Sequence, residues 1–208
     1  MPSGPVFMKN SPSVIRSWCM YDWANSVYSL IITSTLFPVY FNMVAVNEQG
    51  GSQIEFAGLS MPNSALFSYA VSFSFLLAGL TSPLLSAYAD VSGYRRRFLL
   101  FFCLLGSFCC AAMFFFVKGN LEFGMLMFVL AAFGFSSSIV FYNSFLPEIV
   151  SSDLYDRVSA RGFAMGYIGS VLLLIIILLP LFVPVVKLDI GEICRIGFVL
   201  TGLWWFGF

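Results

Sequence analysis

The sequence predicts an all-α membrane protein, a polytopic bundle of six transmembrane helices. Of its 208 residues, 60% are hydrophobic and only 10% are charged, whereas soluble domains carry about 25% charged residues. A soluble fold of this length could not bury so much apolar surface. The apolar residues also fall into long runs between short polar segments, and a helix needs about 20 residues to cross the hydrocarbon core of a bilayer.

The first three spans follow from apolar runs bounded by polar segments. We expect residues 1–16 to form a cytoplasmic N-terminal segment and 18–46 to form the first span. This run is too long for a signal peptide and lacks an A-x-A cleavage site. A polar loop over 47–60 leads to a second span at 63–89, and three arginines precede a third at 98–117.

The remaining spans complete a six-helix domain over residues 17–208. The turn KGNLE leads to a fourth span at 123–146, and the fifth follows at 159–186. After KLDIGE a sixth apolar run covers 193–208 and is still apolar where the sequence stops. We therefore expect the chain to be the truncated part of a longer protein.

The lysine and arginine distribution predicts the orientation of the bundle. One side of the predicted topology carries Lys9, Arg16, Arg95, Arg96, Arg97, Arg157 and Arg161, and the other carries Lys118, Lys187 and Arg195. Because loops rich in basic residues stay in the cytoplasm, we expect the N-terminus to be cytoplasmic. Short loops and the absence of a targeting extension favour a bacterial inner membrane.

The composition excludes several kinds of function. The net charge is zero, so no basic surface indicates a nucleic-acid partner. Without histidine there is no His-based metal site and no Ser-His-Asp triad, and we expect no cofactor, metal or catalytic residue. We interpret the cysteines as small packing residues, because they lie in or beside apolar runs without C-x-x-C spacing: Cys19, Cys103, Cys109, Cys110 and Cys194.

A polar stripe on the first span is the first candidate functional feature. Residues three and four apart share a helix face, and this spacing joins Asp22, Asn25, Ser26, Ser29 and Thr33. In lipid such a stripe is costly, so it should face the bundle interior or water. Two other interpretations are hydrogen bonding between packed helices and, for Asp22 and Asn25, an interfacial helix cap. We expect a solute pathway formed by Asp22, Asn25, Ser29, Thr33, Tyr142 and Asn143.

The start of the fifth span predicts a close helix contact and a charged neighbour for the stripe. Gly162, Gly166 and Gly169 form a small-residue surface, which lets another helix backbone approach. The predicted topology brings Arg161 to the same end of the bundle as Asp22. We hypothesise that the two side chains pair, or belong to one network that holds the mouth of a transporter closed in one state.

The segment SAYADVSGYRRR after the second span is the most specific motif. Asp90 follows a small-residue face, Gly93 permits a tight turn, and arginines open the next helix. The positive-inside rule alone accounts for the arginines but not for Asp90 and Gly93. A carboxylate here can bind a helix N-terminus or an arginine. We expect a gating loop that comprises Ser86, Asp90, Gly93, Arg95 and Arg96.

This loop resembles the signature loop of the major facilitator superfamily. YDWANSVYSLIITSTLFPVYF, FYNSFLPEI and RVSARGFAMGYIGSVLLL resemble a branch related to autophagy-type vacuolar amino-acid effluxers. The resemblance implies a twelve-helix-type transporter of two six-helix halves with its solute site between them, and this chain would be the N-terminal half. In that family the loop aspartate contacts the other half, so Asp90 is expected to be unpaired here.

We therefore expect a secondary active transporter, not an enzyme, that moves a small solute by alternating access. The resemblance implies an amino acid, and Asp22 is a candidate for proton coupling because it lies within a predicted membrane helix. The expected partners are the solute, membrane lipids and the missing C-terminal half. The alternative is a non-transporting six-helix scaffold or lipid-binding protein.

Overall fold

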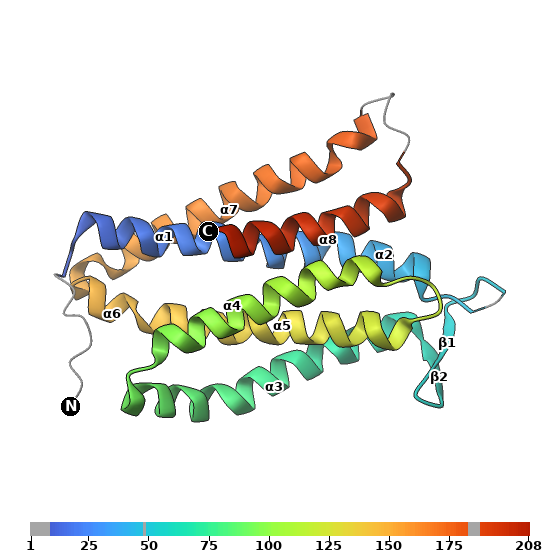
Figure 1. Cartoon of the computed structure of the whole chain (residues 1–208), viewed down its shortest axis with the longest axis horizontal. Coiled ribbons are helices and arrows are strands. Elements are labelled where there is room, and N and C mark those ends of the chain that lie inside the picture. The colour runs from blue at the N-terminus through green and yellow to red at the C-terminus, as the bar shows by residue number, and fades with distance from the viewer. Residues whose placement is uncertain (1–8, 48, 183–187) are drawn as a thin grey trace.

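The computed structural model describes residues 9–47, 49–182 and 188–208, and this part of the chain forms an elongated helix bundle (Figure 1). Five helical stretches are long and apolar enough to cross a membrane: Pro12–Val44, Asn63–Ser92, Arg95–Phe115, Leu121–Ile149 and Ser152–Phe182. The predicted all-α membrane bundle is thereby confirmed. Residues 1–8 of the expected N-terminal segment and 183–186 of the expected fifth span lie outside the described ranges.

The first stretch contains α1 (Pro12–Val27), the π-helical η1 (Tyr28–Leu36) and α2 (Phe37–Val44). It begins at Pro12 rather than at residue 18, since proline suits the first position of a helix. The other elements are α3 (Asn63–Ser92), α4 (Arg95–Ala112), η2 (Met113–Phe115), α5 (Leu121–Ser144), α6 (Leu146–Ile149), η3 (Ser152–Leu154), α7 (Tyr155–Leu178), η4 (Leu179–Phe182) and α8 (Ile190–Gly207). Helix α8 has 18 residues, including Glu192 and Arg195, and is not among the five stretches.

A small β-hairpin begins in the loop expected over 47–60 and ends at Pro62. Strand β1 (Gln53–Phe56) pairs antiparallel with β2 (Leu59–Pro62), and Gln53 lies opposite Pro62. The two turn residues, Ala57 and Gly58, have φ of 51° and 79°, as the tight turns of hairpins require. The hairpin marks one end of the bundle (Figure 1). We call the opposite end, which holds Arg95, Arg96 and Arg97, the arginine-rich end.

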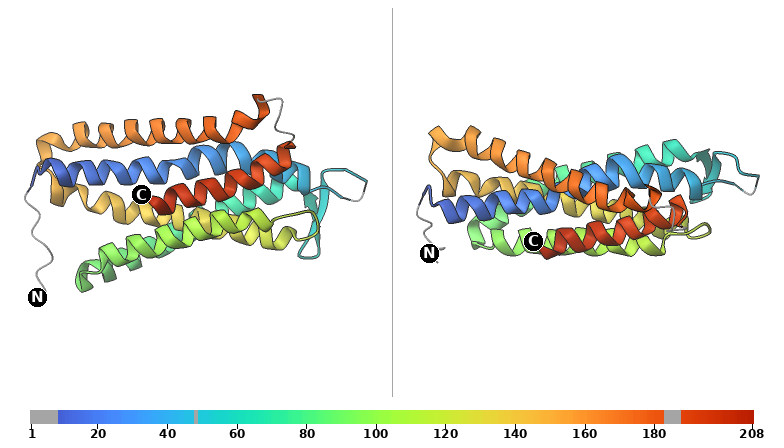
Figure 2. Two further views of the ribbon diagram at one scale, coloured as in Figure 1. Left: turned by 45° about the horizontal axis from the view of Figure 1, so that its top comes forward. Right: turned by 90° about the horizontal axis from the view of Figure 1, so that it is seen from above.

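Helix packing divides the bundle into closely paired helices. Helix α1 runs along α7, α4 runs along α5, and α8 packs against α4 (Figure 2). Helices α4 and α8 approach closely at Gly106, where the Trp205 ring occupies the space that a side chain would need. Stacked aromatic rings fill the core, as in the pair Phe37–Phe128, whose centroids are 4.0 Å apart.

The π-helical stretch η1 interrupts the regular first span. Ser34 Oγ donates to the carbonyl of Ser29 at 2.9 Å, and Thr35 Oγ1 donates to that of Leu30 at 2.7 Å. These hydroxyls bond to the carbonyl five residues earlier, and such bonds from Ser and Thr to the backbone often bend helices. Short π segments occur frequently at functional sites, and this one lies beside a cavity lined by several polar side chains.

Candidate functional site

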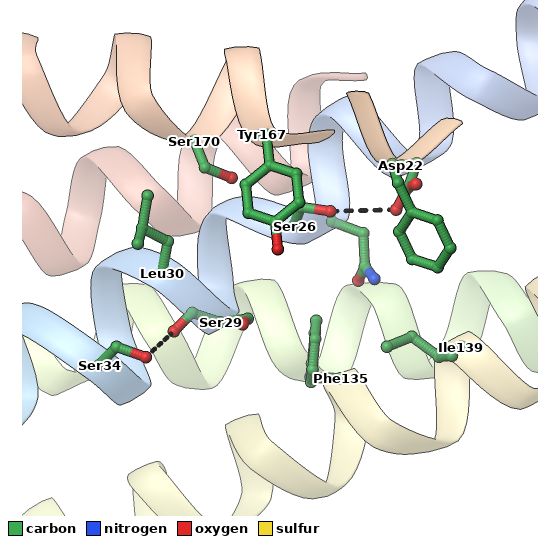
Figure 3. A pocket seen from close by; sticks show the side chains of 11 residues that line it. Asp22, Ser26, Ser29, Leu30, Ser34, Phe135, Ile139, Tyr167 and Ser170 are labelled. Atoms are coloured by element: carbon green, nitrogen blue, oxygen red, sulfur yellow. Dashed lines mark hydrogen bonds between the residues drawn. The ribbon is translucent and has the colours of Figure 1, made fainter. Parts of the chain in front are cut away.

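A polar cavity of about 380 Å³ lies between the first span, α5 and α7 (Figure 3). We call it the Asp22 pocket. It is lined by Asp22, Asn25, Ser26, Ser29, Leu30, Ser34, Phe135, Ile139, Phe163, Tyr167 and Ser170. The polar stripe of the first span therefore faces a cavity, and residues of α7 form its other wall.

Asp22 is a buried carboxylate in this pocket, with 7% of its surface exposed. Its Oδ1 accepts a hydrogen bond from Ser26 Oγ at 3.0 Å, across one helical turn. Its Oδ2 lies 3.2 Å from the position that a Cβ on Gly162 would occupy, and the Tyr142 hydroxyl lies 3.3 Å from that same position. The absence of a side chain at Gly162 thus brings the carboxylate and the phenol to one place.

Tyr142 is held by α1 rather than exposed to the Asp22 pocket. Its ring stacks on Trp18 with centroids 4.3 Å apart, and Trp18 Nε1 donates to the Tyr142 carbonyl at 3.2 Å. The buried Tyr142 hydroxyl has no hydrogen-bond partner among the described residues. Tyr142 lines a second cavity of about 440 Å³ with Trp18, Tyr21 and Arg96. Its ring thus lines this second cavity, and its hydroxyl lies near Asp22.

Asn25 connects the pocket to α5. Its Oδ1 accepts a hydrogen bond from Ser138 Oγ at 3.4 Å, and both side chains are buried. Asn143, the other polar residue expected from the fourth span, has an exposed side chain and does not line the pocket. The α5 wall of the pocket is instead apolar, formed by Phe135 and Ile139.

The π-helical stretch changes which hydroxyl faces the pocket. A regular helix would place Thr33 four residues after Ser29 on the same face. In η1 the side chain five residues on, Ser34, lines the pocket together with Ser29, and Thr33 does not. Thr33, which was expected on the solute pathway, therefore does not line this pocket. The sequence reasoning also missed the α7 residues Tyr167 and Ser170, although both follow the glycines of that helix.

The glycines of α7 lie directly against α1. A Cβ at Gly166 would lie 2.4 Å from Ser26 Oγ, and one at Gly169 would lie 2.9 Å from the carbonyl oxygen of Trp23. Gly162 faces Trp18 and Asp22 in the same way. This contact fixes the distance between the two helices that bound the pocket.

At the arginine-rich end, Arg95 joins three helices. Its Nε donates to Asp90 Oδ1 at 2.6 Å, and its Nη1 donates to Glu148 of α6. Gly93 makes the turn with φ of 72°. The expectation of an unpaired Asp90 is corrected, because Arg95 reaches back across this turn. Ser86 lies half-buried one turn before Asp90, on α3.

The expected direct pair between Asp22 and Arg161 is not formed. In the described part of the chain both ion pairs belong to Arg95. Arg161 has an exposed side chain at the start of α7, so Asp22 has no cationic partner within ion-pair distance there. The sequence reasoning also missed Glu148 as the carboxylate that binds Arg95.

The described chain is thus a bundle of membrane-spanning helices around a polar pocket, with a charged turn between α3 and α4. The family described as vacuole effluxer Atg22 like matches residues 10–208. The chain belongs to this family. The predicted resemblance to a branch of the major facilitator superfamily is confirmed, and the chain is an integral, multi-pass membrane protein.

Curated relatives agree with this assignment. The chain is 30% identical over 201 residues to an uncharacterized MFS-type transporter, YxiO, of Bacillus subtilis, covering 95% of this chain and 45% of the relative. It is 25% identical over 164 residues to autophagy-related protein 22 of Pyricularia oryzae, covering 67% of this chain and 24% of the relative. The chain thus spans less than half of these relatives. No solved structure gives a significant match.

Proposed function

We propose that the full-length protein is a secondary active transporter for a small solute, and that this chain supplies one half of it. The observation that carries the proposal is the Asp22 pocket, in which a buried carboxylate and several serines line a cavity inside an otherwise apolar bundle. Polar groups at membrane depth are expensive unless they face water, a partner group or a substrate. A solute pathway accounts for this cost.

The open side of the pocket supports a second half as the missing partner. Phe163 and Tyr167 of α7 line the pocket, yet 61% and 69% of their surfaces are exposed. A six-helix half placed against α7 would cover these side chains and close the pocket. The relatives are more than twice as long as the matched region, which leaves ample length for such a half. Lipid would cover the outer apolar faces.

The family and the buried Asp22 support a more specific proposal for the solute and the coupling. We expect the solute to be an amino acid, as the resemblance implies, and a proton to be coupled through the Asp22 carboxyl. The groups around it are Ser26 on α1, the Tyr142 hydroxyl from α5 and Gly162 on α7. We place the arginine-rich end in the cytoplasm of a bacterial cell, following the positive-inside rule.

The Arg95 network supports a gate at that end. It ties the end of α3 and the start of α4 to α6 through two carboxylates. Ion pairs of this kind can break when one group of helices rotates against another. We propose that the network is intact in the conformation described and is rearranged when the opposite conformation forms.

Uptake into proteoliposomes tests this function. The full-length protein is reconstituted, and uptake of radiolabelled amino acids is measured with and without an imposed proton gradient. We expect at least one amino acid to accumulate in response to the gradient, and Asp22→Asn to abolish that response. The control is Glu122→Gln, which removes an exposed carboxylate at the start of α5. Uptake that Asp22→Asn leaves unchanged would remove Asp22 from the pathway, and no uptake of any solute would favour a scaffold.

A further inference from the structure

We infer that the Asp22 pocket binds the protonated amine of its solute, with the Asp22 carboxylate as the counter-ion and serine oxygens as additional acceptors. This inference rests on the proposed pathway and specifies the chemical class of solute that this half recognises. It concerns the charge and hydrogen-bonding character of the lining, which the family assignment does not specify.

The charge of the lining is the first argument. Among the described residues that line the pocket, Asp22 is the one with a charged side chain, and the others are hydroxyl, amide, aromatic or aliphatic. A buried carboxylate without a cationic partner is strongly unfavourable. Arg161 forms no ion pair with it, and both ion pairs of the described chain are made by Arg95. A cationic group on the solute would supply the missing charge.

The hydrogen-bond inventory is the second argument. Three serines of the lining already use their hydroxyl hydrogens inside the protein. Ser26 donates to Asp22 Oδ1 at 3.0 Å, Ser34 to the Ser29 carbonyl at 2.9 Å, and Ser170 to the Gly166 carbonyl at 2.7 Å. Their oxygens therefore offer the pocket lone pairs rather than hydrogens. An ammonium group has three donors and no acceptor, so it can donate to these serine oxygens and to the Asp22 carboxylate.

The aromatic walls provide a third argument. The rings of Phe135 and Tyr167 lie on the same cavity as Asp22 (Figure 3). The face of an aromatic ring attracts a cation electrostatically, and the attraction is stronger where water is excluded. A cavity of about 380 Å³ is within the range that accepts small-molecule ligands. The carboxylate, the hydroxyl oxygens and the aromatic lining thus all favour the same positively charged group.

A thermal-unfolding experiment on the full-length protein in detergent tests the inference without measuring transport. The probes are isopentylamine, its neutral counterpart isopentanol and its anionic counterpart isovalerate, at equal ionic strength. A ligand that binds only the folded state raises the melting temperature. We expect isopentylamine to raise it by about 2 °C or more when present well above its Kd, and the alcohol and the acid to leave it unchanged.

Two variants assign the effect to Asp22. Asp22→Asn should abolish the shift caused by the amine, whereas Arg161→Gln should retain it, because Arg161 is not the partner of Asp22 in this structure. Equal shifts from amine and alcohol on the wild-type protein would overturn the inference even if Asp22→Asn did not fold. An amine shift that persists in Asp22→Asn, or no shift with the amine, would also overturn it. A transporter that selects a neutral solute would show no amine-specific shift in melting temperature, yet its uptake would still depend on Asp22. The two experiments therefore distinguish failure of this inference from failure of the proposed function.

Discussion

Asp90 and Arg95 are joined by a 2.6 Å hydrogen bond across the turn between α3 and α4, and the same arginine binds Glu148 of α6. The two carboxylates come from segments far apart in the sequence, so one guanidinium ties the arginine-rich end together. The groups are partly exposed, and exposed ion pairs contribute only about 0–1 kcal/mol each to stability. Their effect should therefore appear in local opening rather than in global unfolding.

Replacing the shared arginine tests this tie. We expect Arg95→Gln to speed amide hydrogen exchange in α6 and at the end of α3 several-fold, while the free energy of unfolding changes by less than ~1 kcal/mol. Arg97→Gln is the control, because the Arg97 guanidinium lies over the Tyr94 ring at 4.4 Å and joins neither described ion pair. The same acceleration in both variants would show that positive charge alone, and not the network, holds this end closed.

The close contact between α1 and α7 requires that position 166 has no side chain. A Cβ at Gly166 would lie 2.4 Å from Ser26 Oγ and 3.1 Å from the Asp22 carbonyl oxygen. We expect Gly166→Ala to force the helices apart and to cost ~1–3 kcal/mol of stability. Thermal unfolding in detergent measures this cost.

The matched control for that variant is Gly79→Ala on α3. A Cβ at Gly79 meets no atom within 4 Å, and alanine favours a helix over glycine by ~1 kcal/mol. The two alanine variants should therefore change the melting temperature in opposite directions. A Gly166→Ala protein as stable as the wild type would contradict the close packing of α1 on α7.

The register of the π-helical stretch gives a prediction that a regular helix would reverse. Ser34 lines the Asp22 pocket and Thr33 does not. We expect Ser34→Ala to reduce solute uptake by the full-length protein about tenfold, as loss of a polar contact worth ~1.4 kcal/mol would do, and Thr33→Ala to leave it within twofold. Both variants remove one hydroxyl from the same helix. Loss of uptake in Thr33→Ala alone would restore the regular helical register.

Hydrogen bonds at Asn10 join the N-terminal segment to residues 149–151 at the arginine-rich end. The backbone N–H of Asn10 donates to the Ile149 carbonyl at 2.8 Å, and the side-chain Oδ1 of Asn10 accepts from the backbone N–H of Ser151 at 2.9 Å. Asn10 also has a positive φ of 65°, which costs ~1–2 kcal/mol in most residues other than glycine. Because the Asn10 side chain holds the Ser151 N–H, its loss should loosen the segment that follows α6.

Two substitutions of Asn10 separate the effect of its side-chain hydrogen bond from that of its positive φ. Asn10→Gly should speed amide exchange at residues 149–151 through loss of the side-chain bond, worth ~0.5–1.5 kcal/mol, and Asn10→Ala should speed it further. Asn143→Ala, at an exposed position of α5, should have no effect there. Unchanged exchange in both Asn10 variants would show that the N-terminal segment does not hold this loop.

The helices and the polar stripe could be predicted because both depend on local patterns. Apolar runs of membrane-spanning length set the spans, and helical spacing put Asp22, Asn25 and Ser29 on one face, where the structure has them. The same spacing rule failed at Thr33, because the first span is π-helical there and residues five apart, rather than four, share a face. The three- and four-residue spacing of a regular α-helix cannot reveal a local π-helical stretch.

Contacts between distant segments could not be predicted from local patterns. Arg95 can reach Asp90, Glu148 or solvent, and only the packing of α6 beside the turn decides among them. Tyr167 and Ser170 of α7 line the pocket because α7 packs beside α1, and the stripe on the first span does not indicate that packing. The hairpin over residues 53–62 was missed because its strands are short and its turn is Ala-Gly.

Accessibility of the Asp22 pocket from the two aqueous phases tests the central claim most directly. A Ser29→Cys variant of the full-length protein is treated with a membrane-impermeant maleimide in right-side-out and in inside-out vesicles, with the wild-type protein as the control for its native cysteines. A solute pathway that works by alternating access predicts that Cys at position 29 reacts from both sides. Reaction from neither side, or from one side only under all conditions, would contradict the assignment of this pocket as the pathway.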